Sequence, residues 1–267
     1  MRAVVFLYAA ALWPGAVPAD EQVLSELVLR NPEIAILGEA HDNPEHHVNQ
    51  TRAVELLAPK ALVFEMLSPR QAARGATAPR ADVAALEAAL GWDDSGWPDF
   101  AMYHPIFAAA PDARLYGAEV PATDLRRAVE TGAAAVFGGQ AARFGLDRAL
   151  APEDKAEREA EQVKAHCDAL PTDRLAGMVE AQRLRDAALA GAALTAHAET
   201  GGPVVVITGN GHARRDRGIP AMLALAAPGL TIVSLGQMEG TAPPDAPFDL
   251  VIVTDAPERG DPCLAFR

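Results

Sequence analysis

The stretch from residue 36 to residue 50, ILGEAHDNPEHHVNQ, places two glutamates, an aspartate and three histidines directly after a short apolar run. Carboxylate and imidazole side chains at this spacing can bind a metal ion, transfer protons or hold a larger cofactor. The same stretch has the signals of a helix start, because Asn43 is a preferred N-cap residue and Pro44 suits the first helical position. These residues alone leave all of these interpretations open.

Six short apolar runs, each ending in polar or glycine residues, are candidates for the strands that position this chemistry. They cover residues 34–37, 61–64, 114–116, 204–207, 231–235 and 250–253. Apolar runs without alternation are typical of strands that are buried on both faces of a parallel sheet. The sequence therefore predicts an α/β fold with a mostly parallel β-sheet flanked by helices.

Helical patterns lie between the predicted strands. A helix is expected to start at Pro44 and to end before Pro59, with His47, Gln50 and Val54 on one face. Residues 151–196 contain no strand-like run and are rich in good helix formers, which predicts a helical insertion between strands three and four. Residues 68–79 are rich in Ala, Gly, Pro and polar residues and are interpreted as a loop.

Polar residues follow the first four predicted strands at the same kind of position. They are Glu39, His41, Glu65, Glu119, Asn210 and His212. Ligands of open parallel α/β sheets bind outside the carboxyl ends of the strands, so we expect these side chains to share one site. Arg214 follows closely and can receive an anion, although an arginine run such as this one more often starts a solvated helix.

One chemistry that this set permits is metal-dependent hydrolysis. Glu39, His41, Glu65 and His212 together offer carboxylate and imidazole ligands for zinc or manganese, with a coordination position left open for water. One of the two glutamates would then act as the general base.

The second chemistry is suggested by residues 91–105, GWDDSGWPDFAMYHP, which concentrate aromatic residues in a chain with 5% aromatics. Trp97, Tyr103 and His104 can form one wall of a haem pocket, with Tyr103 as an axial ligand of ferric iron. The alternative is that this segment fills the hydrophobic core with its tryptophans.

The first nineteen residues have the order of a secretory signal peptide, with Arg2, an apolar run and then small residues up to Ala19. This divides the chain into a signal peptide, residues 1–19, and one domain, residues 20–267. No segment reaches the length that a transmembrane helix needs, so none is expected after signal cleavage, and the predicted location is periplasmic or secreted.

Export would permit a disulfide bond, and the net charge of the chain limits the partners that we expect. In an oxidising compartment Cys167 and Cys263 can form a disulfide, although two separate buried thiols are the alternative. The formal net charge of −13 argues against nucleic acid as a partner.

Six separated segments together resemble the ChaN-like family of haem-binding proteins of bacterial iron uptake, which is related to Tiki, TraB and erythromycin esterases. They are LGEAHDNPEHHVNQ (37–50), FEM (64–66), WDDSGWPDFAMYHPIF (92–107), AHCDALP (165–171), AQRLRDAALA (181–190) and ITGNGHARRDRGIPAML (207–223). The resemblance implies an exported α/β protein that binds haem, in some members as a dimer with haem between two subunits. The chain differs from membrane-anchored members in lacking a lipobox cysteine.

The resemblance also indicates which residues would bind the cofactor. It makes Tyr103 and His104 the candidates for ligands of the haem iron. The full predicted cofactor-binding set is Tyr103, His104, Trp97, His41, His47, Asn210, His212 and Arg214. We therefore expect an exported haem-binding protein of haem or iron uptake or handling, with no catalytic step required.

The zinc or manganese hydrolase stays open as the alternative. In the wider superfamily, elements that match Gly38–His41 and Gly209–His212 lie in the site of metal-dependent hydrolases.

Overall fold

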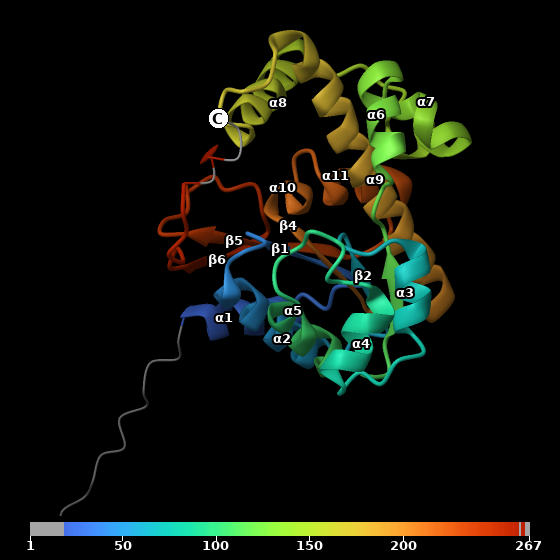
Figure 1. Ribbon diagram of the computed structural model, residues 1–267, viewed down its shortest axis with the longest axis vertical. Coiled ribbons are helices and arrows are strands. Elements are labelled where there is room, and N and C mark those ends of the chain that lie inside the picture. Colours follow the sequence, from blue (N-terminus) through green and yellow to red (C-terminus); the bar gives the residue numbers. More distant parts are fainter. Residues whose placement is uncertain (1–18, 262, 265–267) are drawn as a thin grey trace, which may run out of the picture.

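The structure is a computed structural model that describes residues 19–261 and 263–264. The predicted signal peptide lies outside the described residues except for Ala19, which begins helix α1. Figure 1 shows a central sheet covered by helices on both faces, with further helices extending beyond one edge of the sheet.

The sheet has six strands in the order β3-β2-β4-β1-β5-β6, and every neighbouring pair is parallel. The strands are β1 (Ile34–Glu39), β2 (Ala61–Phe64), β3 (Arg114–Gly117), β4 (Val204–Gly209), β5 (Ile232–Glu239) and β6 (Leu250–Thr254). Each strand contains one of the predicted apolar runs almost completely, which confirms the α/β fold with a parallel sheet. The central pair β1 and β4 is in register from Ile34 beside Val204 to Glu39 beside Gly209.

Alternate side chains of the strands point into two separate hydrophobic layers. Leu37, Leu62 and Phe64 pack with helices on one face, which are α1 (Ala19–Leu29), α2 (Pro44–Leu57), α4 (Val83–Leu90) and α5 (Phe100–Ala109). Ile36 and Val63 pack on the other face with α6 (Ala122–Thr131), α7 (Ala133–Phe137), η1 (Gly138–Phe144), α9 (Leu175–Thr200), α10 (Asn210–Ala213) and α11 (Ile219–Ala226). Apolar side chains on both faces are the reason why the strands lack polar alternation.

The start of helix α2 agrees with the sequence prediction. The Asn43 side chain accepts a hydrogen bond from the backbone N–H of Glu45, and Pro44 occupies the first turn. His47, Gln50 and Val54 are buried on one face of the helix. The cap fixes where the chain turns after β1, and so it sets the position of the polar residues between the strand and the helix.

The connection between β3 and β4 is helical from Ala122 onward, which is earlier than the predicted start at residue 151. It includes α6, α7, η1, α8 (Pro152–Ala165), η2 (Thr172–Arg174) and the 26-residue helix α9. At about 1.5 Å per residue, α9 is about 39 Å long and runs from these outer helices down onto the sheet. One helix therefore connects the helical segment to the sheet face.

Two segments are helical where the sequence interpretation did not expect it. The predicted loop at residues 68–79 contains α3 (Pro69–Gly75), which a capping box between Ser68 and Gln71 begins. The aromatic segment 91–105 becomes α5 from Phe100 onward, and this helix buries Phe100, Tyr103 and Phe107 in the core. The interpretation of residues 68–79 as a loop was therefore wrong.

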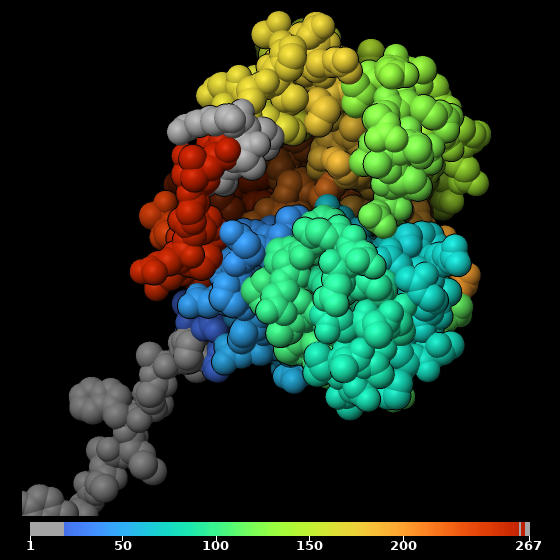
Figure 2. Space-filling view, in the orientation of Figure 1, coloured from blue at the N-terminus to red at the C-terminus, as the bar shows by residue number. Residues whose placement is uncertain are grey.

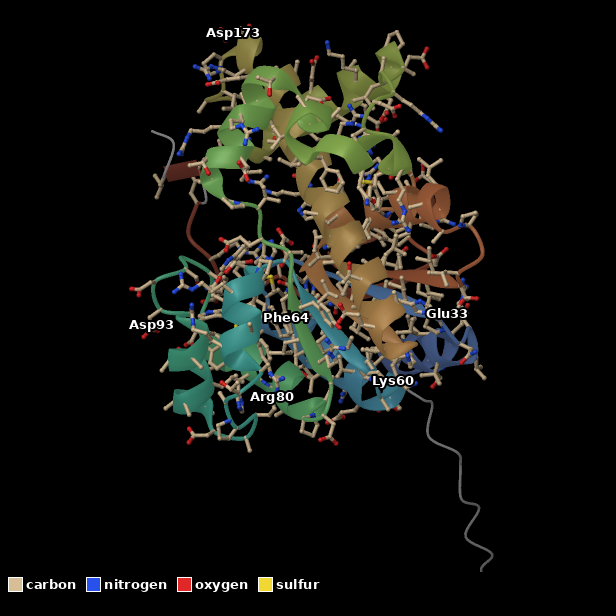
Figure 3. The ribbon with its side chains drawn as sticks, turned by 90° about the vertical axis from the view of Figure 1, so that its right-hand side faces the viewer. Glu33, Lys60, Phe64, Arg80, Asp93 and Asp173 are labelled. Carbon is tan, nitrogen blue, oxygen red and sulfur yellow. A yellow bond between two sulfur atoms is a disulfide. The ribbon has the colours of Figure 1, made fainter. Side chains whose placement is uncertain are left out.

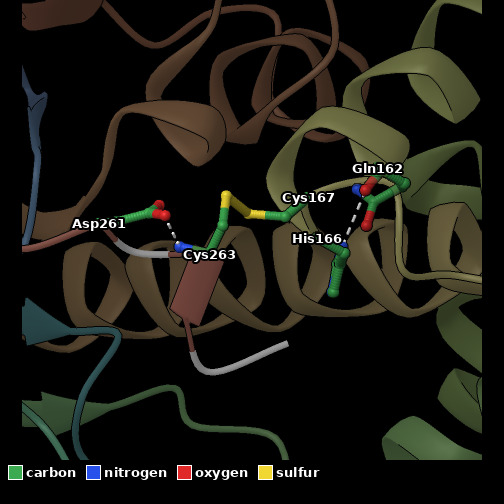
Figure 4. Close-up of a disulfide and its surroundings, with 5 residues drawn as sticks. All are labelled: Gln162, His166, Cys167, Asp261 and Cys263. Carbon is green, nitrogen blue, oxygen red and sulfur yellow. Dashed lines mark hydrogen bonds between the residues drawn. A yellow bond between two sulfur atoms is a disulfide. The ribbon is translucent and has the colours of Figure 1, made fainter. Parts of the chain in front are cut away.

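The predicted disulfide is present between Cys167, directly after α8, and Cys263 near the carboxyl terminus, 96 positions apart in sequence. Figure 4 shows the bond beside the backbone N–H of Cys263, which donates to Asp261. Before this link, the Arg259 guanidinium binds Asp42 and Glu239. None of the helices in the described part of the chain is long and apolar enough to cross a membrane.

Candidate functional site

A cleft of about 340 Å³ opens at the carboxyl ends of β1, β2 and β3, beside helix α9. Figure 2 shows the molecule hollowed between α6–α8, in green and yellow, and the blue-to-cyan half below them. The cleft is lined by His41, Glu65, Trp97, Ala118, Glu119, Val120, Leu125, Arg185 and Leu189. It therefore lies at the edge of the sheet where the sequence predicts a shared site.

The His41 imidazole lines the cleft, and a buried carboxylate binds one of its ring nitrogens. Its Nδ1 is 2.7 Å from Oε1 of Glu39, which is 2% exposed. Among the described residues no hydrogen bond engages Nε2 of His41. Burial lowers the pKa of His41, but the hydrogen bond to Glu39 and the charge of Glu65 outweigh burial, so the pKa is raised. In the neutral ring, a proton held on Nδ1 by Glu39 leaves the Nε2 lone pair available to a ligand, which competes with a second proton because the pKa is raised.

Two further side chains fix Glu39 from the core side. The Tyr103 phenol donates a hydrogen bond of 2.7 Å to Oε1 of Glu39, and burial and this carboxylate both raise the pKa of Tyr103. His47 donates from Nε2 to the carbonyl of His41, and its Nδ1 lies 3.5 Å from Oε2 of Glu39. Both Tyr103 and His47 are buried, so they position Glu39 and His41 and do not line the cleft.

Glu65, at the end of β2, is held by strand β4. Its Oε2 accepts hydrogen bonds from the Thr208 hydroxyl at 2.7 Å and from the Gly209 backbone N–H at 2.8 Å. Burial favours the neutral acid, but the charge and hydrogen bond of His212 outweigh burial and hold the pKa of Glu65 well below its usual value. Glu65 is therefore a fixed negative charge at the floor of the cleft.

His212 bridges Glu65 to a second buried carboxylate on α9. Its Nδ1 lies 2.5 Å from Oδ1 of Asp186, and its Nε2 lies 3.3 Å from Oε1 of Glu65. Burial lowers the pKa of His212, but the two carboxylates outweigh burial and raise it to about 10. Because both ring nitrogens face carboxylates, His212 is a buried imidazolium that links α10 to α9 and β2.

Close packing at two glycines explains the spacing of the strand-end motifs. A Cβ on Gly209 would lie 2.9 Å from Nε2 of His41, and a Cβ on Gly38 would lie 2.5 Å from Oδ1 of Asn210. Both distances are too short for a side chain without displacing its neighbour. The two glycines therefore leave the room that the His41 ring and the Asn210 side chain occupy beside β4 and β1.

The remaining wall of the cleft combines apolar side chains with two charged groups. Trp97 packs edge-on against His41, with ring centroids 4.9 Å apart. Leu125 and Leu189 add apolar surface from α6 and α9. Arg185 and Glu119 line the same cleft, and burial raises the pKa of Glu119.

Several predicted site residues lie outside the cleft. Asn210 is bound to the backbone of Gln237 by two hydrogen bonds, and Arg214 pairs with Asp216 and Glu161. Both side chains are thus engaged in structural contacts. Their assignment to a cofactor site stays a prediction to which this arrangement adds no support.

His104 points away from the cleft. Its Nε2 lies 2.9 Å from the backbone carbonyl of Arg80. In Figure 3, Arg80 lies below Phe64, on the side opposite Asp173 at the tip of the outer helices. Ligation of iron by His104 or by the buried Tyr103 would require α5 to rearrange, because neither ring reaches the cleft in this structure.

The predicted site did not include three residues of α9, which are Gln182, Arg185 and Asp186; the last two were expected only to brace the helical segment by pairing with neighbours. Gln182 contacts the His212 ring and Asp186 binds it, while Arg185 lines the cleft. The spacing of Gln182 and Asp186 by four positions was a usable signal, because it places both on one face of a helix. Which face meets the sheet is decided by tertiary packing.

The proposed zinc or manganese ligands do not fit a metal ion in this arrangement. Glu39 lies behind His41, and both ring nitrogens of His212 face carboxylates. Among residues 19–261 and 263–264, no three His, Cys, Asp or Glu side chains form a group that could hold a metal ion. We derive no hydrolytic step from these residues.

A family model and a similar solved structure agree with the α/β fold. The family model described as "Haem-binding uptake, Tiki superfamily, ChaN" matches residues 28–223. A structure described as "Cofacial heme binding to ChaN of Campylobacter jejuni" is similar with a TM-score of 0.66 and 18% identity, covering 88% of this chain and 91% of that chain. The type III effector HopBA1 has a TM-score of 0.46 and 15% identity, covering 87% and 93%. No curated protein matches the chain.

The fold and the cleft define an α/β protein with a cleft at the carboxyl edge of a parallel sheet. The family model covers more than half of the chain. The chain therefore belongs to the ChaN family of haem-binding uptake proteins in the Tiki superfamily, which confirms the resemblance found in the sequence.

Proposed function

We propose that this protein binds haem in the cleft and that Nε2 of His41 is the ligand of the iron. The observation that carries the proposal is the His41 imidazole at the cleft wall, with Nδ1 bound to Glu39 and with Nε2 free of hydrogen bonds to the described residues. A histidine that binds a metal through one nitrogen commonly donates the other N–H to a carboxylate. Glu39 would fix the tautomer and the orientation of the ring.

The cleft wall fits the rest of the group. Trp97, Val120, Leu125 and Leu189 provide apolar surface against which a porphyrin face can pack, and the cleft volume lies within the range of roughly 300–1,000 Å³ that ligand pockets span. Haem, when bound, supplies the iron centre. The chain itself would supply burial, one nitrogen donor and orientation.

Tyr103 and His104 stay in the proposal as alternative iron ligands that depend on a rearrangement. Tyr103 would have to break its hydrogen bond to Glu39, and His104 its contact with the Arg80 carbonyl. His41 needs no such change, and we place it first for that reason.

Export, iron uptake and self-association complete the proposal. The Cys167–Cys263 disulfide supports an oxidising compartment, and the family description supports a role in uptake. The similar Campylobacter jejuni structure is described as binding haem cofacially. We therefore propose that a second copy of this chain covers the exposed side of the haem. Sedimentation velocity with and without haem tests whether the protein forms this dimer.

A titration of the purified protein with ferric haem, followed at the Soret band, tests the function. We expect a saturable, red-shifted band that His41→Ala loses or shifts and that Tyr103→Phe retains. Loss of the band in Tyr103→Phe with no effect of His41→Ala would assign the iron to the phenol. No saturable band in the unmutated protein would reject haem as the ligand.

A further inference from the structure

The Arg185 guanidinium lines the cleft, and no hydrogen bond or ion pair joins it to any of the described residues. This distinguishes it from the other arginines whose side chains are at least partly buried. In each of those the guanidinium makes a hydrogen bond or an ion pair, namely in Arg80, Arg158, Arg183, Arg214 and Arg217. A partly buried guanidinium without a protein partner has hydrogen-bond donors left for water or for a ligand that enters the cleft.

The position of Arg185 on α9 directs it to the ligand side of the site. The next residue, Asp186, turns to the core and binds His212. His212 in turn faces Glu65, which also accepts hydrogen bonds from β4. The negative charge of Glu65 at the floor of the cleft therefore already has partners, whereas Arg185 on the wall has none among the described residues.

We propose that Arg185 binds a carboxylate of the bound ligand, and that this ligand is an amphipathic acid with a flat apolar body. With haem as the ligand, the carboxylate is a propionate. This inference rests on the proposed haem function and adds the polar contact that sets the orientation of the macrocycle. The planar guanidinium matches a carboxylate through two parallel hydrogen bonds, while Trp97, Leu125 and Leu189 contact the apolar body.

Glu119 is the competing partner, because its carboxylate lines the same cleft. An ion pair between Glu119 and Arg185 would occupy the guanidinium and leave Arg185 no role in binding a ligand. Burial raises the pKa of Glu119, which weakens it as a partner relative to an incoming carboxylate.

The test uses metal-free protoporphyrin IX and its dimethyl ester, followed by quenching of tryptophan fluorescence, so that the readout is independent of iron ligation. Arg185→Gln is expected to weaken binding of the free acid by roughly tenfold or more, as for loss of a charge-assisted hydrogen bond, and to change binding of the ester by less than about twofold. Arg185→Lys should give an intermediate loss for the acid, because the charge stays and the paired geometry is lost. Arg126→Gln, an exposed arginine on α6, is the matched control and should change neither affinity.

The outcomes separate the two proposals. Equal losses for acid and ester, or no loss for either, in an Arg185→Gln protein with an unchanged melting temperature would overturn the role of Arg185 while leaving haem binding intact. Binding of neither porphyrin by the unmutated protein, together with a flat titration with ferric haem, would reject the haem function and this inference with it.

Discussion

At the scale of single residues, the site is a set of buried charges that pair with one another, beside an imidazole whose Nε2 has no hydrogen bond to the described residues. His212 lies between Glu65 and Asp186, and His41 is held by Glu39. Charges buried in this way persist only with partners, so removing one side chain affects the others. The consequences of that coupling can be measured as a function of pH.

The imidazolium of His212 predicts a loss of stability at alkaline pH. Burial opposes the charge, but Glu65 and Asp186 raise the pKa of His212 to about 10, above an ordinary value of 6.5. Its contribution to the free energy of unfolding is therefore fully present below pH 6.5 and is lost as the pH rises through 10, with a slope of up to about 1.4 kcal/mol per pH unit. Urea unfolding between pH 6 and pH 10 measures the slope.

His212→Gln provides the comparison for this prediction. The variant leaves two buried carboxylates without their cation, so at pH 7 its free energy of unfolding should be lower by roughly 3–5 kcal/mol. Its stability should also fall less steeply between pH 6.5 and 10. Identical slopes in the two proteins would mean that His212 is neutral in the folded state.

Gly209 is predicted to be essential for placing His41. An added Cβ would lie 2.9 Å from Nε2 of His41, the nitrogen that we propose binds iron. Gly209→Ala should therefore displace the ring and weaken haem binding by roughly tenfold or more, a loss of about 1.4 kcal/mol or more, measured by Soret titration. Gly211→Ala is the matched control, because its Cβ would meet only Gln182 Nε2 at 3.8 Å. Equal affinities for the two variants would contradict a role for the free Nε2.

At the scale of elements, the strands could be predicted because their signal is local. The apolar runs identified six strands, and the structure extends β1 to Glu39, β4 to Gly209 and β5 to Glu239 through polar or glycine residues. The ladder continues through backbone groups, which do not depend on side-chain polarity. The amino-terminal cap of α2 was predictable for the same reason, since Asn43 and Pro44 act within one turn.

The parts that sequence reasoning missed depend on tertiary packing or on a short signal that was overlooked. His41, Glu65 and His212 were expected at one edge of the sheet, whereas Asp186 and Arg185 were not, because the rotation of α9 against the sheet is set by its contacts. Tyr103 was expected at a haem pocket or in the core, and its placement in the core follows from the burial of α5.

Helix α3 shows the overlooked local signal and allows a direct test. The Ser68 hydroxyl accepts from the backbone of Gln71, and the Gln71 side chain accepts from the backbone of Ser68. Ser68→Ala removes one side of this capping box and should lower the free energy of unfolding by about 1 kcal/mol. Ser25→Ala, at an exposed serine in α1, should change it by less than about 0.5 kcal/mol. Equal changes in the two variants would show that the cap does not stabilise α3.

At the scale of the whole molecule, the carboxyl-terminal segment connects parts that are far apart in the fold. The Arg259 guanidinium binds Asp42 and Glu239 near the ends of β1 and β5, and its hydrogen bonds to Glu239 hold the pKa of that carboxyl at about 2. Beyond it, Cys263 is joined to Cys167 at the end of α8. The disulfide thus adds a covalent link between α8 and the carboxyl-terminal segment to the chain connections of the outer helices through α6 and α9.

This added covalent link predicts a large effect of the disulfide on global stability. The bond closes a segment of 96 positions, and a loop of that size restricts the unfolded chain enough to contribute roughly 2–5 kcal/mol. Urea unfolding of Cys167→Ser with Cys263→Ser should therefore show a lower midpoint than the oxidised protein, and dithiothreitol should lower the midpoint of the unmutated protein to the same value. Arg259→Gln should cost less, because its ion pairs lie near the surface, where solvent screens them. A midpoint that neither the serine variant nor reductant changes would mean that the outer helices and the sheet unfold independently of the carboxyl-terminal link.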